Sequence, residues 1–225
     1  METRLKKSYK PAEVGQVVEL PPEFKEYLGC GRFGRIGVAG DGSCFFHSIC
    51  ALLHEKNYLN EPPSVQATIA HNFRCRFSKT FKKNDMIHGK RGSNDESYED
   101  LRKGFCVPSK WANETMINHA SKVLNINLIF LDLTNGLAYC GVHGSESLRG
   151  SRTRSVNAVK QPTAVFSWVT RSHFEPIVRI ESKDPGEPVV LTTLFEPSKS
   201  EEDANTVEIL MAAYDRGCSR RMPLN

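Results

Sequence analysis

Apolar residues follow two different periods along this chain, and together these periods predict an α+β fold. Over residues 43–55 and 62–82 they recur every three to four positions, as on one face of a helix. Elsewhere they form short β-rich runs bounded by turn residues, which are typical of strands. We expect such strands at 127–131, 137–142, 163–169 and 173–180. The sequence therefore predicts helices packed on a β-sheet that contains two hairpins.

The helix over residues 62–82 is expected to have one packed face and one polar face. Ile69, Phe73 and Phe77 repeat every four residues and should pack inward. The basic side chains that alternate with them, Arg74 included, are expected on a solvated face or against an acidic partner.

Two further helices are predicted later in the chain. Over residues 110–124 the apolar spacing is expected to turn Trp111 toward the core. Over residues 201–216 an apolar stripe that includes Val207 and Leu210 either docks on the domain or binds a partner.

A cysteine stands at the start of the first of these helices. Residues 40–43 are turn formers, and helical apolar spacing begins directly after them, so Cys44 falls in the first helical turn. Free N–H groups and the positive dipole end at that place favour a thiolate. Ser43 or Asp41 can supply an N-cap oxygen, and the adjacent glycines let backbone N–H groups converge near the sulfur. An activated nucleophile and an inert buried cysteine both fit this pattern.

Two histidines are candidates for the base that such a nucleophile needs. His47 lies three positions after Cys44 and is its neighbour on the helix. Its side chain projects along the helix rather than over the sulfur, which makes it the secondary candidate. His173 opens a strand-like run far along the chain, so it can meet Cys44 only through the fold, as the base and nucleophile of Cys/His proteases do.

Composition narrows the class of protein. The formal net charge of +4, from 30 Lys and Arg against 26 Asp and Glu, is too mild to predict nucleic-acid binding. The seven cysteines include no Cys-x-x-Cys pair, the first residues contain no hydrophobic signal region, and no apolar run reaches about 18 residues. We expect a soluble monomer in the reduced cytoplasm that binds neither membranes nor nucleic acid.

A glycine motif precedes the cysteine. Residues 29–34 read Gly-Cys-Gly-Arg-Phe-Gly, a literal G-x-G-x-x-G. A dinucleotide site requires this motif to follow a strand and open a helix, whereas here a helix-like segment precedes it and a strand-like run follows. We predict a loop without a nucleotide site.

The residues around the cysteine and the late histidine resemble a known family. Asp-Gly-Ser-Cys-Phe-Phe at 41–46, followed by Ser48, is similar to the nucleophile signature of ovarian-tumour (OTU) cysteine proteases, which are deubiquitinases. Ser-His-Phe-Glu-Pro-Ile at 172–177 resembles the family's late strand with a His before an aromatic residue. Trp111 resembles its tryptophan at a helix start. The resemblance spans roughly residues 30–180.

The resemblance implies a papain-like OTU cysteine protease fold, with a central helix carrying Cys44 packed on a mixed sheet. It implies that Cys44 attacks and His173 acts as base, with no metal or organic cofactor. Backbone N–H groups near Gly42 would hold the oxyanion. The expected reaction is hydrolysis of the isopeptide or peptide bond after the terminal glycine of ubiquitin or a ubiquitin-like modifier.

Two carboxylates compete for the third catalytic role. Alternation along a strand puts His173 and Glu175 on one face, about 6.5 Å apart at Cα, so Glu175 is placed to orient the imidazole. The family more often has Asp or Asn there. Asp41, three residues before the nucleophile, corresponds to a residue that shapes the oxyanion loop in related enzymes. We predict that Glu175 orients the base and Asp41 shapes the loop.

The resemblance also suggests substrate-binding residues. Gly42, Trp111 and Phe174 adjoin the expected catalytic pair. The substrate tail of the family carries arginines, and an acidic stretch that includes Glu96 and Glu99 is a candidate acceptor for them. The alternative is an ordinary helix N-terminus, where carboxylates are favourable.

The chain is accordingly divided into an N-terminal segment (1–29), an OTU-like catalytic domain (30–181) and a C-terminal linker with a possible helix (182–225). Two other functions stay open. One is a catalytically weak adaptor that binds ubiquitin, although its expected signature, loss of the Cys or the His, is absent. The other is a peptidase that uses the same Cys and His to process a polyprotein.

Overall fold

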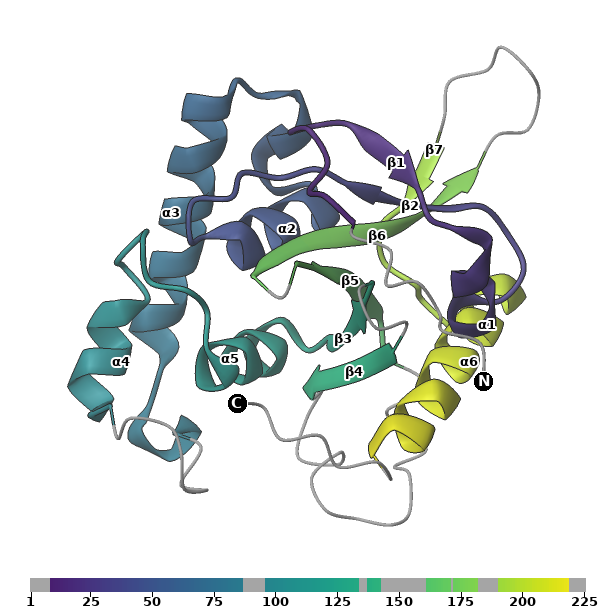
Figure 1. The fold of residues 1–225 in the computed structure, drawn as a ribbon. Helices are drawn as coiled ribbons and strands as arrows, with labels where there is room; N and C mark the ends of the chain where they lie inside the picture. The colour runs from purple at the N-terminus through teal and green to yellow at the C-terminus, as the bar shows by residue number, and fades with distance from the viewer. Residues whose placement is uncertain are drawn as a thin grey trace.

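A seven-stranded mixed sheet forms the centre of the molecule (Figure 1). The computed structural model describes residues 9–86, 96–133, 137–142, 161–170, 172–181 and 190–218. The strands are β1 (Val17–Glu19), β2 (Phe33–Ile36), β3 (Asn127–Asp132), β4 (Leu137–Val142), β5 (Thr163–Val169), β6 (His173–Glu181) and β7 (Val190–Thr192). Their order is β1-β2-β6-β5-β3-β4, with β7 also paired to β6. Only β3 and β5 run parallel among these pairs, and both predicted hairpins, β3–β4 and β5–β6, are confirmed as antiparallel.

Helices cover both faces of this sheet. The α-helices are α1 (Lys25–Leu28), α2 (Cys44–Leu52), α3 (Pro63–Thr80), α4 (Tyr98–Gly104), α5 (Glu114–Leu124) and α6 (Glu201–Cys218). Three short 3₁₀ helices are η1 (Pro22–Phe24), η2 (Glu55–Asn60) and η3 (Lys83–Asp85). Figure 1 shows α2 to α5 on one side of the sheet and α1 with α6 on the other. The predicted α+β class is therefore confirmed.

Strand residues alternate between two hydrophobic cores. Phe130 of β3 packs in the core under α2 and α3, while its neighbours Ile129 and Leu131 pack in the core under α6. Because both faces of the strand are covered, its sequence is a continuous apolar run rather than an alternating one. The buried run identified from sequence thus reflects a sheet with helices on both sides.

The C-terminal helix packs on the sheet. Val207 and Leu210 are fully buried in the second core, which answers the choice that the sequence left open. A buried ion pair between Asp203 of α6 and Arg179 of β6 also links the helix to the sheet. The described C-terminal helix thus contributes to the central fold, as does β1 near the N-terminus, which pairs with β2. The domain boundaries proposed from sequence stay predictions.

The segment before α5 differs from the prediction. The helix begins at Glu114 rather than 110, because the Asn113 side chain accepts a hydrogen bond from the Met116 N–H and caps it there. Trp111 lies in the preceding loop and is 57% exposed. The expectation that it faces the core is wrong.

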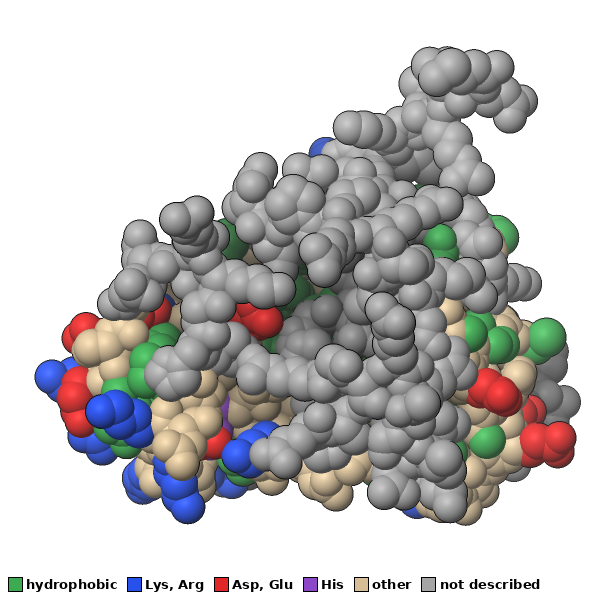
Figure 2. Space-filling model, turned by 90° about the horizontal axis from the view of Figure 1, so that it is seen from below, with side chains coloured by type: hydrophobic (Ala, Val, Ile, Leu, Met, Phe, Trp, Pro, Cys, Tyr) green, Lys and Arg blue, Asp and Glu red, His purple; other side chains and the backbone are tan. Residues whose placement is uncertain are grey.

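The described surface carries mixed charge. On the face in Figure 2, acidic and basic side chains are interspersed around the described margins. None of the helices within the described ranges is both long and apolar enough to span a bilayer.

Candidate active site

Cys44 is the first residue of α2, and the turn before it is built by Asp41. The Asp41 carboxylate accepts the Ser43 N–H through Oδ1 at 3.0 Å, and Gly42 adopts a φ of +83° that favours glycine. The Ser43 hydroxyl donates to the Pro108 carbonyl at 3.0 Å and makes no capping bond to the helix. Since the first N–H groups of a helix have no partner within it, this end can stabilise negative charge.

His173 reaches this helix from the sheet. It opens β6, whose pairing with β5 extends to His173 while its pairing with β2 stops at Ile177. The Ser48 hydroxyl of α2 donates to the Phe174 carbonyl of β6 at 3.1 Å, which joins the two elements beside the histidine. The side chains of Cys44 and His173 lie close enough to interact electrostatically, and this interaction raises the pKa of His173. The structure therefore brings the two sequence-predicted residues together.

The imidazole of His173 lies between the turn that precedes Cys44 and a carboxylate. Its Nε2 is 3.6 Å from Glu175 Oε1, which is an ion-pair contact longer than a direct hydrogen bond. A Cβ atom at Gly40 would stand 3.6 Å from Nδ1, so the opposite edge of the ring faces the turn that leads to Cys44. Cysteine, imidazole and carboxylate thus occur in the order of a hydrolytic triad.

The Glu175 carboxylate is completely buried and is held by groups that the sequence prediction missed. Arg35 of β2 pairs with Oε2, and the Ala12 N–H donates to Oε1 at 2.6 Å. Arg35 also donates to the Lys10 carbonyl at 2.8 Å. One signal was available, because a lone charge in a buried strand usually has a partner. The backbone contacts of the N-terminal segment have no sequence signature.

These neighbours determine how the pair titrates. Burial lowers the pKa of His173, but interactions with Cys44 and Glu175 outweigh it and raise that pKa to about 9. For Glu175, burial raises the pKa. The interactions with His173, Arg35 and the Ala12 N–H lower it by more than burial raises it, so the net shift of this pKa is downward. The site favours an imidazolium beside an ionised carboxylate.

The raised pKa of His173 predicts a pH-dependent stability. The pKa rises from the usual 6.5 to about 9, so its contribution is complete below pH 6.5 and is lost as pH rises through about 9. In Cys44→Ala one raising partner is gone, so the decrease in the free energy of unfolding from pH 7 to 10 should be smaller by on the order of 1 kcal/mol. Urea unfolding of both proteins across this pH range measures the difference, and identical pH dependences would contradict the pairing.

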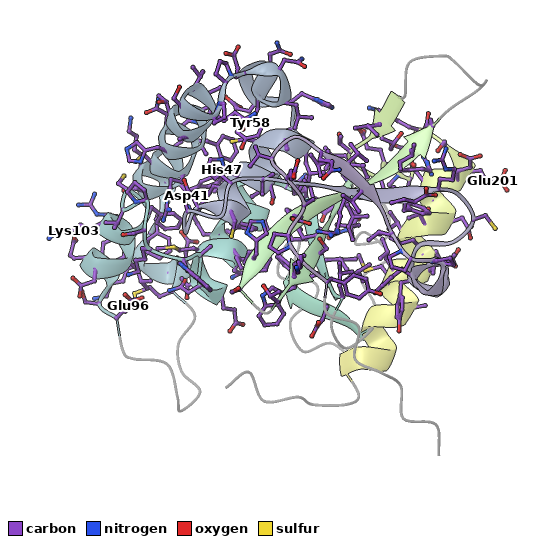
Figure 3. All side chains as sticks on the ribbon, turned by 45° about the horizontal axis from the view of Figure 1, so that its top comes forward. Asp41, His47, Tyr58, Glu96, Lys103 and Glu201 are labelled. Atoms are coloured by element: carbon purple, nitrogen blue, oxygen red, sulfur yellow. The ribbon has the colours of Figure 1, made fainter. Side chains whose placement is uncertain are left out.

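His47 is engaged elsewhere (Figure 3). Its Nε2 is 3.1 Å from Asp41 Oδ2, and its Nδ1 is 2.6 Å from the Tyr58 hydroxyl. An ionised carboxylate only accepts, so Nε2 carries the hydrogen and Nδ1 accepts from Tyr58. Burial lowers the pKa of His47, despite the opposing effect of Asp41. Both nitrogens of a neutral ring are therefore occupied, which fits support of the Asp41 turn rather than the role of base.

Gly42 offers a test of the turn itself. An added Cβ there would lie 2.9 Å from the Ser109 carbonyl oxygen, in a backbone conformation that side chains rarely adopt. Gly15 has nearly the same φ, +81°, but no atom within 4 Å of that position. We expect Gly15→Ala to lose about 1 kcal/mol of stability from the conformation alone, and Gly42→Ala to lose more. Only Gly42→Ala should also lower kcat for the hydrolysis proposed below, and equal effects of both changes would exclude a special role for this turn.

The proposed substrate-binding residues lie in different surroundings. Exposed Trp111 follows Pro108 and Ser109 in the sequence, and the carbonyls of those two residues face Gly42. Phe174 is half-buried, and its ring packs against core aromatic rings. Their roles toward substrate stay predictions.

Glu96 and Glu99 already have basic partners. Glu96 pairs with Lys110 and accepts from the Asn113 amide at 3.2 Å. Glu99 forms an exposed pair with Arg102 at 3.3 Å. A substrate arginine would have to displace or join these contacts, and the acceptor role of both carboxylates stays a prediction. Within the described ranges, no group of three or more His, Cys, Asp or Glu side chains is arranged to hold a metal ion.

Comparison with known proteins gives matches in structure but not in sequence. No family model matches the chain, and no curated protein matches it. One similar solved structure is the Hazara virus OTU bound to ubiquitin, with 11% identity and a TM-score of 0.43, covering 67% of this chain and 83% of that one.

Two further similar structures are OTU domains. An ovarian tumor (OTU) domain in complex with ubiquitin has 16% identity and a TM-score of 0.45, covering 84% of this chain and 88% of that one. The OTUD1 OTU domain has 14% identity and a TM-score of 0.41, covering 64% and 85%. All three belong to the family that the motifs around Cys44 and His173 resemble.

Proposed function

We propose that this protein is a cysteine hydrolase that cleaves the isopeptide or peptide bond after the terminal glycine of ubiquitin or a ubiquitin-like modifier. The observation that carries the proposal is the arrangement of Cys44, His173 and Glu175, in which a buried imidazole lies between a thiol at a helix start and an ionised carboxylate. This arrangement is suited to acyl transfer through a thioester.

Each group has a defined part in the proposed reaction. The Cys44 thiolate attacks the carbonyl carbon, and N–H groups at the start of α2 stabilise the oxyanion. His173 gives its proton to the departing amine as the C–N bond breaks. Water then attacks the thioester, His173 takes a proton from it, and the C–S bond breaks to restore the Cys44 thiolate beside a protonated His173. Glu175 keeps the imidazole oriented throughout.

The low exposure of Cys44 and His173 supports a substrate that ends in glycine. Cys44 and His173 are each only 6% exposed, and the carbonyls of Pro108 and Ser109 lie close to Gly42. A residue without a side chain needs the least space to bring its carbonyl to the sulfur. The deubiquitinase resemblance of residues 41–46 and 172–177 selects ubiquitin-type tails among such substrates.

Hydrolysis of ubiquitin joined through its terminal glycine to a fluorescent lysine peptide tests the proposal. We expect turnover that releases free ubiquitin, and a matched substrate with alanine in place of the terminal glycine should be cleaved much more slowly. Binding of the conjugate without cleavage would instead support an adaptor. Equal cleavage of both substrates would exclude selection for the terminal glycine.

A further inference from the structure

Arg74 of α3 is buried completely, contrary to the solvated position expected from its sequence context. Each of its nitrogens donates hydrogen bonds to a neutral acceptor. Nε bonds to the Phe105 carbonyl, Nη2 to the carbonyls of residues 104 and 110 at 3.1 and 2.9 Å, and Nη1 to the carbonyl of residue 108 at 3.1 Å and to Ser43 Oγ at 2.7 Å. All five N–H groups of the guanidinium are thereby used.

These bonds connect α3 to the start of the nucleophile helix. Ser43 directly precedes Cys44, and its hydroxyl both accepts from Arg74 and donates to the Pro108 carbonyl. The guanidinium carbon also lies 4.7 Å from the ring centroid of Phe46, in the first turn of α2. The same side chain therefore fixes the helix start and residues 104–110, the segment that faces Gly42.

The charge of Arg74 acts on the same place. Burial lowers the pKa of Arg74, while attraction to Cys75 and Cys106, and to a smaller extent to Asp41 and Cys44, opposes that shift. Because the acceptors of its five bonds are neutral, those bonds leave its positive charge uncompensated. A buried cation that interacts with Cys44 favours the thiolate over the thiol.

We propose that Arg74 is a positioning residue for the nucleophile: it fixes Ser43 and residues 104–110 around the start of α2 and supplies positive charge that favours the Cys44 thiolate. The consequence for turnover rests on the proposed hydrolase function. The effect of Arg74 on the reactivity of the Cys44 thiol is independent of that function, because it is measurable without any substrate.

Alkylation of Cys44 by iodoacetamide across pH tests the charge. Peptide mapping by mass spectrometry follows this cysteine alone. In Arg74→Met we expect the half-maximal pH for alkylation to rise by about one unit, and in Arg74→Lys, which keeps the charge, to stay close to wild type. The control is Arg76→Met on the exposed face of the same helix, where Arg76 pairs with Glu55 at 2.9 Å; its alkylation profile should be unchanged.

Turnover of the ubiquitin–lysine peptide conjugate tests the positioning. Ser43→Ala removes the hydroxyl's bonds to Arg74 and to the Pro108 carbonyl but leaves the Arg74 side chain in place, while Arg74→Lys offers three N–H groups where five were used. In both we expect kcat to fall about tenfold or more with KM unchanged, because the nucleophile is displaced rather than the substrate site.

The outcomes separate the two proposals. If Cys44 of the wild-type protein is alkylated but the protein does not cleave the conjugate, the proposed hydrolase function is wrong. The effect of the Arg74 charge on Cys44 is then still tested by the alkylation profiles. An active wild type together with Arg74→Met and Ser43→Ala variants that keep its alkylation profile and kcat would overturn the role of Arg74. If circular dichroism shows that Arg74→Met does not fold, the other two variants decide the question. A kcat equal to wild type in both Ser43→Ala and Arg74→Lys would then overturn the role of Arg74.

Discussion

Replacing His173 by Gln is expected to lower kcat for the ubiquitin–lysine peptide conjugate by about 10³- to 10⁴-fold, because the leaving amine then has no proton donor. The substituted glutamine keeps a polar side chain of similar reach at the start of β6, so the fold should persist. KM should change little if His173 acts mainly in the transition state. Steady-state kinetics with circular dichroism on the same preparation measure both effects.

The matched control is His71→Gln on α3. His71 is a half-buried histidine whose Nε2 lies 3.8 Å from Cys75 Sγ, away from the proposed pair. This change should leave kcat within about twofold of wild type, since His71 does not contact Cys44, His173 or Glu175. A similar loss from both changes, or retained activity in His173→Gln, would assign the base to another residue.

Glu175 is expected to affect catalysis and stability separately. Glu175→Gln keeps an acceptor for Arg35 but removes the negative charge, so kcat should fall about 10²-fold. The pKa of His173, which Glu175 helps to raise to about 9, should fall as well. The basic limb of the pH–rate profile should therefore move to lower pH, a shift that a purely structural residue would not cause.

Glu175→Ala adds a loss of stability to the same loss of activity. It leaves the Arg35 guanidinium, 6% exposed, without its carboxylate, which costs about 3–5 kcal/mol for a buried pair. Changing Arg35 to Met in the same protein removes the uncompensated charge and should recover much of the free energy of unfolding, but not kcat. Recovery of kcat in the double variant would mean that Glu175 serves the fold alone.

The closeness of Cys44, His173 and Glu175 was predictable because its signals are local. Turn residues before helical spacing placed Cys44 at a helix start, and strand alternation put His173 and Glu175 on one face; the structure brings all three together. The two hairpins followed from apolar runs for the same reason.

The supporting groups depend on contacts that the sequence does not encode locally. Arg74 follows Phe73 at a position that the helical spacing assigns to the polar face. It is buried because residues 104–110 cover it and accept hydrogen bonds from its guanidinium. The Ala12 N–H reaches Glu175 from the far end of the chain through backbone alone. Trp111 was expected inside because Pro108 suggested an early helix start, whereas the Asn113 cap sets the boundary after it.

The most direct measurement is covalent capture by ubiquitin that carries a thiol-trapping group at its C-terminus. We predict a one-to-one adduct on the wild-type protein, with the mass increase mapped to the peptide containing Cys44 and absent from Cys44→Ala. Cys30 is an exposed free cysteine and serves as the internal control for nonspecific labelling. An adduct that survives in Cys44→Ala, or that maps to Cys30, would contradict the assignment of Cys44 as the nucleophile.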